Sequence, residues 1–508
     1  MAIAKYAHVL TTSTSNNLGN TDSNIFDKDN YSGFTRKAES NGITYSSNTG
    51  EFTVDEDGTY FVFVTVQASL TSPISFGSIR CRVKLDGAEV EAGIFDFNDS
   101  YGVVENSFQT LVTATSGQKI TITLHDPTAS SHGLKAEKFS SVFIFKTENG
   151  FGRVARTTAS DLTSAEFNAF ATSSGGATTT NFSSDAKFSE TDAGSGLFKF
   201  NNDVNALFFI NNYLEGDGGS PPVDIDFKLD STIINTYRSA KPAPSEPVET
   251  SILSAYSFSS NTSASILYDA VGVSYNTRCN TSSSMTAVEL PSEAHFLWRT
   301  VKTDGDVTSA DTEFNVFATG TYSGNGYSVF GTGSGITFTS GSGLVTLARD
   351  GAYAIFSNFY GTIGADADFM YKIKHNASVA DNILFHMDAS TDPGDRTVVT
   401  VITGAVAGDT IQFFASGSGR SLKSETGAGF IVLELFAADE PVVTSTCDNL
   451  PLFNRDPSVF NPYNNCDQYT LETITQPPFI LGARGYGVTR KNDTALVVDP
   501  GAKSNPDD

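Results

Sequence analysis

The chain has little positive charge, and this limits its partners. Lysine and arginine total 32 against 57 acidic residues, so the formal net charge is −25 at pH 7. Proteins that bind nucleic acid or an anionic membrane need a basic surface, and both partners are therefore disfavoured. A strongly acidic surface instead keeps a concentrated or assembled protein soluble.

Long apolar runs are also missing. No stretch reaches the roughly 18 apolar residues of a transmembrane helix, and the first residues, MAIAKYAHVLTTSTSNNLGN, lack the apolar core of a secretory signal. We expect the protein to be made and assembled inside a cell, unless a signal has been removed.

Only four cysteines are present. Cys81 and Cys279 are interpreted as small buried apolar residues. Cys447 and Cys466 lie close together near the C-terminus, where a disulfide is possible, but sequence alone does not supply its geometry. No Cys-x-x-Cys spacing occurs and no histidine lies near this pair, so a zinc site is not expected.

Catalytic motifs are absent as well. None of the six histidines lies in a metal-binding spacing, and no Gly-x-Ser-x-Gly motif opens a helix. Asp55 with Asp57, and Asp392 with Asp395, offer oxygen ligands for calcium. Both pairs are better explained as turn or loop residues. We therefore expect no enzyme activity, no cofactor and no metal.

The chain is rich in internal repetition. The segment GITYSSNTGEFTVDEDGTYFVF returns later as GITFTSGSGLVTLARDGAYAIF, and a weaker copy, KFSETDAGSGLFKFNNDVNALFF, lies between them. The outer copies share four positions in the same order and spacing: Gly42, Gly50, Gly58 and Tyr60 against Gly335, Gly343, Gly351 and Tyr353. The repeat unit is roughly 146 residues, the size of an ordinary domain.

Further matches set the register of the repeats. Lys84, Lys228 and Lys372 lie at equal intervals, and EFNAFAT from Glu166 returns as EFNVFAT from Glu313. The predicted organisation is three tandem domains and a tail, with these bounds: 1–150, 151–300 (divergent), 301–440, and 441–508.

Apolar residues alternate with polar ones inside each repeat, which predicts strands. Ile120, Ile122 and Leu124 alternate with Thr121 and Thr123. Asp-Gly dipeptides between such runs predict hairpins. No long segment has helical periodicity, so the fold class is all-β, as tandem sandwiches.

Some strands are apolar on both faces. After Gly58, Tyr60 and Val62 point to one side and Phe61 and Phe63 to the other, which predicts burial on both sides. One side suits the sandwich core, and the other favours an interface with a subunit or domain over a covering loop. Each repeat is expected to close on an apolar strand, namely SVFIFK, HFLW (His295–Trp298) and FIVLELF, and to begin on a lead-in strand such as EFNAFAT.

The tail combines proline with aromatic residues. Eight of the seventeen prolines lie in 441–508, where they hinder regular structure. A disordered tail would be poor in aromatics. We predict an extended arm that docks on another surface, with a small subdomain as the alternative. The docking residues are expected to be Phe453, Phe460, Tyr463, Phe479 and Tyr486.

The pattern G-x-F-x-V, a turn, D-G-x-Y and a buried aromatic strand resembles the C1q/tumour-necrosis-factor jelly roll. The resemblance covers most of repeats one and three, and the second repeat has Asp203-Val204-Asn205-Ala206 where D-G-x-Y is expected. It implies a ten-stranded, two-sheet domain that trimerises around an apolar axis. The residues expected to face that axis are Tyr60, Phe61, Phe63, Phe208, Tyr353 and Phe356.

Two assemblies satisfy this resemblance. A homotrimer is favoured over a pseudo-trimer formed by the three repeats of one chain. The chain also resembles bacteriophage virion proteins, such as head decoration proteins and fibres. The expected function is therefore a structural virion protein, assembled in the host cytoplasm, that docks on other virion proteins such as the major capsid protein. The alternative is a receptor-binding tail fibre or glycan-binding module that uses exposed aromatics such as Tyr213, Tyr237 and Tyr360.

Overall fold

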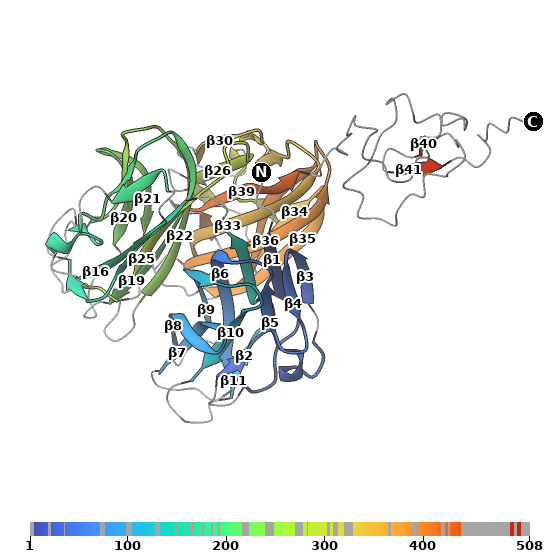
Figure 1. The fold of residues 1–508 in the computed structure, drawn as a ribbon, viewed down its shortest axis with the longest axis horizontal. Helices are drawn as coiled ribbons and strands as arrows, with labels where there is room; N and C mark the ends of the chain where they lie inside the picture. The colour runs from blue at the N-terminus through green and yellow to red at the C-terminus, as the bar shows by residue number, and fades with distance from the viewer. Residues whose placement is uncertain are drawn as a thin grey trace, which may run out of the picture. The chain divides into compact units, whose positions relative to one another are not determined.

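The protein is all-β, as the sequence predicts. The computed structural model describes residues 5–437 and, beyond them, only 488–491 and 495–498, with these gaps in the first range: 19–21, 35, 72–76, 98–103, 127–132, 148–149, 163–166, 175–176, 184–185, 191–193, 216–222, 239–247, 270–277, 282, 302–304, 308–312, 320–328, 364–366, 388–393, 418–421 and 425–426. The regular elements described are antiparallel strands and two single-turn 3-10 helices, η1 (Lys28–Asn30) and η2 (Thr172–Ser174). Figure 1 shows the strands in two-layered sandwiches.

The first sandwich contains two sheets. One has the order β9-β6-β12-β1-β3, with the short β11 beside β6, and its strands are β1 (Tyr6–Thr11), β3 (Arg36–Asn41), β6 (Gly58–Leu70), β9 (Val104–Ala114), β11 (Leu134–Ala136) and β12 (Ser141–Lys146). The other has the order β4-β5-β10-β7-β8, with the short β2 beside β10, and its strands are β2 (Ser23–Asn24), β4 (Ile43–Ser46), β5 (Glu51–Val54), β7 (Gly77–Leu85), β8 (Ala88–Phe97) and β10 (Lys119–His125). The first and last long strands pair in the middle of one sheet, which is the jelly-roll order.

The second sandwich repeats this order. Its first sheet contains β13 (Phe151–Arg156), β14 (Ser160–Asp161), β16 (Thr178–Phe182), β19 (Val204–Glu215), β22 (Val248–Phe258), β24 (Arg278–Cys279) and β25 (Ser284–Glu289). Its second sheet contains β15 (Phe167–Asn168), β17 (Phe188–Glu190), β18 (Phe198–Phe200), β20 (Asp224–Leu229), β21 (Thr232–Arg238) and β23 (Ser263–Asp269).

The third sandwich follows the same plan. Its first sheet contains β26 (Phe296–Val301), β27 (Gly305–Val307), β29 (Val329–Phe330), β30 (Gly333–Ser334), β33 (Gly351–Ile363), β36 (Gly394–Ala405), β38 (Leu422–Ser424) and β39 (Gly429–Ala437). Its second sheet contains β28 (Phe314–Asn315), β31 (Thr337–Thr339), β32 (Leu344–Thr346), β34 (Ala367–His375), β35 (Ser378–Met387) and β37 (Thr410–Gly417).

The second repeat closes on a different strand from the one predicted. His295–Trp298 was expected to close it, but Phe296–Val301 is β26, which pairs with β39 of the third sandwich. The second sandwich closes on β25, which pairs with β13. The expected boundary at residue 300 therefore falls inside a strand of the third sandwich. HFLW resembles a closing strand because β26 is apolar and lies beside β39 in the middle of its sheet.

The predicted lead-in strands are also wrong. EFNAFAT and EFNVFAT supply only the two-residue edge strands β15 and β28, whereas the sandwiches begin on β13 and β26. The lysine register shifts as well. The bulge that precedes Lys84 in β7 and Lys228 in β20 precedes Lys374 in β34, so the structural equivalent is Lys374 rather than Lys372.

One asparagine in each repeat serves as a clamp at the same place. Asn24, Asn168 and Asn315 each accept the backbone N–H two residues ahead, at 3.0–3.1 Å, which is an Asx turn. Their amide nitrogens donate to the carbonyls of Thr49, Ser195 and Ser342, each just before a glycine with positive φ: Gly50, Gly196 and Gly343. The clamp explains why FN recurs in EFNAFAT and EFNVFAT.

An aspartate in each repeat ties two hairpins together. Asp57, Asp203 and Asp350 accept the backbone N–H groups of Ser116, Ser260 and Ala407, at 2.7–2.8 Å. The second repeat therefore keeps the aspartate although it lacks the Gly-x-Tyr that follows elsewhere. This shared contact places the divergent repeat in register with the other two.

The C-terminal segment forms a second compact unit, Ala438–Asp508, apart from Met1–Ala437. Within it the structure describes one hairpin, β40 (Val488–Lys491) paired with β41 (Ala495–Val498). The extended-arm prediction did not include this hairpin. Cys447, Cys466 and the five predicted docking aromatics lie outside the described residues.

We expect Gly196→Ala to destabilise the second sandwich. A Cβ there would lie 2.5 Å from the Phe170 carbonyl carbon, and the φ of +66° disfavours any side chain. The expected cost is about 1–3 kcal/mol, measured as a lower thermal unfolding midpoint. Gly117→Ala is the matched control, since its φ is also positive but the added Cβ would meet open space. Equal effects of the two changes would contradict the clamp.

Candidate functional site

Three phenylalanines from equivalent strands meet where the sandwiches join. Phe63 comes from β6, Phe209 from β19 and Phe356 from β33. Their ring centroids lie 6.2 Å (Phe63–Phe209), 5.8 Å (Phe63–Phe356) and 5.7 Å (Phe209–Phe356) apart, within the ~4.5–7 Å range of favourable aromatic pairs. All three are fully buried. The second face of each of these strands is therefore covered by the other two repeats of the same chain.

Two more rings extend this cluster. Phe61 lies 4.2 Å from Phe209, and Phe143 lies 5.5 Å from Phe356, measured between ring centroids. We call Phe61, Phe63, Phe143, Phe209 and Phe356 the junction. Because it is complete within one chain, its burial needs no second copy. The homotrimer was favoured because the outer aromatic faces needed a partner, and the other repeats of the same chain supply that partner.

The structure divides the six predicted interface residues into two groups. Phe61, Phe63 and Phe356 lie in the junction. The prediction is wrong for the other three, which are fully buried inside individual sandwiches: Tyr60, Phe208 and Tyr353. Strand alternation explains the difference, because neighbours along a strand point to opposite faces.

The two tyrosines have a local role instead. The Tyr60 hydroxyl donates to the Glu56 carbonyl and the Tyr353 hydroxyl to the Arg349 carbonyl, both at 2.7 Å. Each thereby secures the turn just before its strand. Phe208 packs within the second sandwich against Phe198, 5.7 Å away between centroids.

Sequence reasoning missed Phe209. It occupies the position of Phe63 and Phe356 once the repeats are aligned through Asp57, Asp203 and Asp350. The segment NALFFI contains two adjacent phenylalanines, Phe208 and Phe209, which point to opposite faces of the strand. The sequence alone did not show which of them faces the other repeats.

A ring of hydrogen bonds lies next to the aromatic cluster, two residues further along the strands. The Ser251 hydroxyl donates to the Ser107 carbonyl, the Ser107 hydroxyl to the Thr397 carbonyl (3.4 Å), and the Asn358 amide to the Ser251 carbonyl (3.3 Å). The ring runs from the second repeat to the first, then to the third and back to the second. All four residues are buried. Since a buried donor without a partner is costly, these bonds favour one rotation of the repeats about the junction.

Polar contacts also join the repeats in pairs. The Asn211 amide donates to the Gln109 carbonyl at 3.2 Å, and the His8 Nε2–H donates to the Val399 carbonyl at 3.1 Å. Arg153 pairs with Glu91 at 2.7 Å. Burial raises the pKa of the Glu91 carboxyl, against the opposing effect of the Arg153 charge.

The first and third repeats have an ion pair at the same place, but the acidic and basic partners are exchanged between the two repeats. Lys146 of β12 pairs with Glu56 at 2.7 Å, whereas Glu434 of β39 pairs with Arg349 at 2.6 Å. Glu56 and Arg349 occupy the same turn position. Hydrogen bonds from Lys146 and then Lys5 lower the pKa of Glu56 to about 2.

The described residues do not assemble a metal site. Among them no three histidine, cysteine, aspartate or glutamate side chains lie close enough to hold a metal ion. Asp55 pairs with Lys5 at 2.9 Å and Asp57 accepts a turn N–H, so both act as turn residues, as preferred from the sequence. Asp392 lies outside the described residues, and Asp395 is described only as backbone in β36.

Two of the three aromatics expected to bind glycans are not at the surface. Tyr213 and Tyr237 are 6% and 3% exposed, so that prediction is wrong for both. The side chain of Tyr360 lies outside the described residues. Cys81 and Cys279 are buried free thiols, as predicted, and burial raises the pKa of Cys279.

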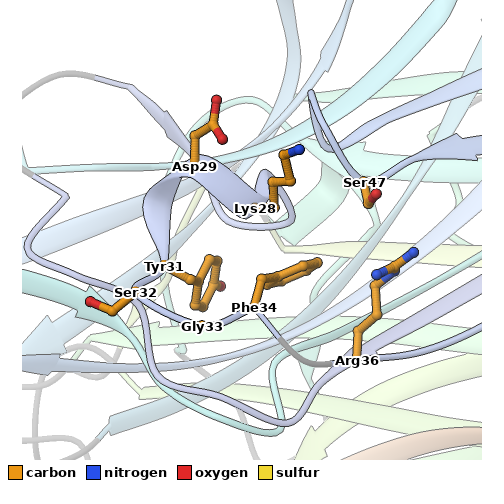
Figure 2. A pocket seen from close by; sticks show the side chains of 8 residues that line it. All are labelled: Lys28, Asp29, Tyr31, Ser32, Gly33, Phe34, Arg36 and Ser47. Carbon is orange, nitrogen blue, oxygen red and sulfur yellow. The ribbon is translucent and has the colours of Figure 1, made fainter.

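A surface pocket of about 510 Å³ lies in the first sandwich, between η1, the start of β3 and the end of β4. Figure 2 shows its lining side chains, which combine two aromatic rings, two cations, one carboxylate and small polar groups: Lys28, Asp29, Tyr31, Ser32, Gly33, Phe34, Arg36 and Ser47. Its charged, hydroxyl and aromatic side chains are groups that can contact a ligand.

Comparison with known proteins identifies no relative. No protein-family model matches the chain, and no curated protein sequence is similar to it. In the part of the chain that the structure describes, no helix is long and apolar enough to cross a membrane.

We expect Phe356→Ala to uncouple the third sandwich from the other two, which remain in contact through Phe61, Phe63 and Phe209. The change removes ring contacts with two other repeats, and a buried Phe→Ala change costs about 3–5 kcal/mol. Calorimetry should show one unfolding transition for the parent protein and separate transitions for the variant. Phe413→Ala is the control, because Phe413 lies inside the third sandwich. It should destabilise the third sandwich without separating it from the other two, and an identical trace for both variants would argue against the junction.

The Glu56 ion pairs should make stability depend on pH. The folded-state pKa of about 2 lies below the ordinary glutamate pKa of 4.5, so the stabilisation is present above pH 4.5 and is lost as the pH falls towards about 2. Glu56→Gln should therefore lower the thermal midpoint at pH 7 but have little effect near pH 2. A midpoint difference that persists undiminished at the lower pH would rule out an electrostatic origin.

Proposed function

We propose that this chain is a structural protein of a bacteriophage virion, a single-chain pseudo-trimer that decorates or extends the capsid. The observation that carries the proposal is the closed junction formed by Phe63, Phe209 and Phe356. It joins three jelly rolls into one body through residues at equivalent positions of the three repeats.

The strand order supports the resemblance to C1q/tumour-necrosis-factor domains. Each repeat pairs its first and last long strands in one sheet, and equivalent strands of the three repeats meet at an apolar centre. The resemblance implies a trimer about such an axis, and here tandem repetition supplies its three members. Covalent linkage fixes their number, which suits a protein that must present one defined body at each docking position.

The polar groups near the junction support a structural role. Ser107, Ser251, Thr397 and Asn358 are engaged in joining repeats, so these buried side chains hold the body together instead of aiming at a cavity. The acidic surface keeps an exposed particle component soluble. Docking is assigned to residues 441–508, on another virion protein such as the major capsid protein.

Removing residues 438–508 should abolish docking and leave the body folded, because the body forms its own compact unit. Full-length and truncated protein would be added to particles that lack the chain, and binding scored by sedimentation and electron microscopy. Light scattering before mixing should give the 54.0 kDa monomer mass for the full chain.

Three results would count against the proposal. Truncated protein that still decorates particles would remove the tail's role. A mass three times that of the chain would restore the homotrimer. Virions can also be purified from the phage that carries the coding sequence and examined by mass spectrometry. If the chain is not detected in them, the virion role is refuted.

A further inference from the structure

The pocket in the first sandwich has the size and the exposure of a ligand-binding site. Its volume of about 510 Å³ lies in the roughly 300–1,000 Å³ range of ligand pockets. It is lined from a short stretch around η1 and from Ser47, and Lys28, Asp29, Ser32 and Arg36 are exposed. A ligand can therefore reach it directly from solvent.

An aromatic base forms one wall. The Tyr31 and Phe34 rings lie 4.7 Å apart between centroids, and Figure 2 shows them side by side. Tyr31 is nearly buried, and its hydroxyl donates to the Ile25 carbonyl. Phe34 is half-buried, so part of its ring remains open to a ligand.

Arg36 is held in place by rings. Its guanidinium carbon lies 5.5 Å from the Phe34 centroid and 5.3 Å from that of Tyr45, within the ~6 Å of a cation–π contact. The Tyr45 hydroxyl donates to the Phe26 carbonyl at 2.7 Å, which fixes the ring beneath the cation. The guanidinium is thus positioned without using its N–H donors.

Among the described residues, no acidic side chain pairs with either cation of the pocket. Within the described residues, neither Arg36 nor Lys28 forms an ion pair or donates a side-chain hydrogen bond, although the chain carries a net charge of −25. Other cations nearby are paired, such as Lys119 with Glu51 at 2.8 Å. Two exposed cations that pair with no described acid, one of them stacked on aromatic rings, favour an anionic ligand.

The fold does not require these cations. The first repeat has three basic residues between Asn24 and Gly42, at positions 28, 36 and 37. The corresponding segments of the other repeats, 168–187 and 315–335, contain one basic residue, Lys187, at the position of Gly42, and it pairs with Glu289. Two repeats thus form the same asparagine clamp and sandwich without them, so the cations serve something other than folding.

We propose that this pocket binds a sugar that carries a carboxylate, such as a uronic or sialic acid unit. The apolar face of the sugar ring packs on Phe34, and its carboxylate accepts two N–H bonds from the Arg36 fork, a geometry that arginine offers and lysine does not. Lys28 adds charge, while Ser32, Ser47 and Asp29 lie where sugar hydroxyls can bond.

The test compares matched sugars on the purified full-length chain. The probes are methyl glucuronide and the methyl glycoside of N-acetylneuraminic acid, with methyl glucoside as the neutral counterpart and glucose 6-phosphate as the phosphate counterpart. Binding is measured by saturation-transfer NMR and titration. The carboxylated sugars should bind at least about tenfold more tightly than methyl glucoside, which corresponds to about 1.4 kcal/mol.

Four variants locate the binding. Arg36→Gln should abolish the preference for the carboxylate, Arg36→Lys should keep only part of it, and Phe34→Ala should weaken all sugars. Lys138→Gln is the control, because Lys138 also lies over a ring, 5.4 Å from the Phe139 centroid, but outside the pocket. It should bind as the parent does, and unchanged thermal midpoints would show that all variants fold.

Several outcomes would overturn the assignment. They are equal binding of charged and neutral sugars, an unchanged preference in Arg36→Gln, and tighter binding of glucose 6-phosphate, which would make the pocket a phosphate site. The pocket proposal does not depend on the virion role. Because the measurement uses protein free of particles, failure here leaves the docking experiment unaffected.

Discussion

The contact among Phe63, Phe209 and Phe356 is the interaction on which the rest of this structure depends. Each ring projects from the outer face of a strand whose inner face fills a sandwich. Each would expose apolar surface to water if its repeat stood alone, and the three together bury one another. Each repeat has an apolar outer face that must be buried, and the three repeats of one chain bury these faces against one another.

Directional contacts add specificity to that apolar contact. An aromatic cluster alone would tolerate some rotation of the repeats relative to one another. The hydrogen bonds from Ser251 to Ser107, from Ser107 to Thr397 and from Asn358 to Ser251 can form together in only one relative orientation. The bonds close on themselves only because three similar units face a common centre. Inside each repeat, the asparagine clamp and the Asp57-type contact set the turns.

The three repeats differ in their surface charges while they share the contacts that hold the fold together. The turn–strand ion pair keeps its place but reverses its sign between Glu56–Lys146 and Arg349–Glu434, so the pairing matters rather than which side carries which charge. The basic residues of the pocket occur in the first repeat alone. Common positions thus maintain the body, and a position peculiar to one repeat is where a binding function can be placed.

The sequence by itself determined the all-β class, the triplication, the hairpin turns and the two-sided burial of the strand from Gly58, because alternation and turn chemistry are local. It did not decide whether Tyr60 or Phe63 meets another repeat, that Phe296–Val301 belongs to the third sandwich, or that the outer faces find partners within one chain. Those outcomes depend on pairings between residues far apart in the chain, and only the tertiary structure brings such residues together.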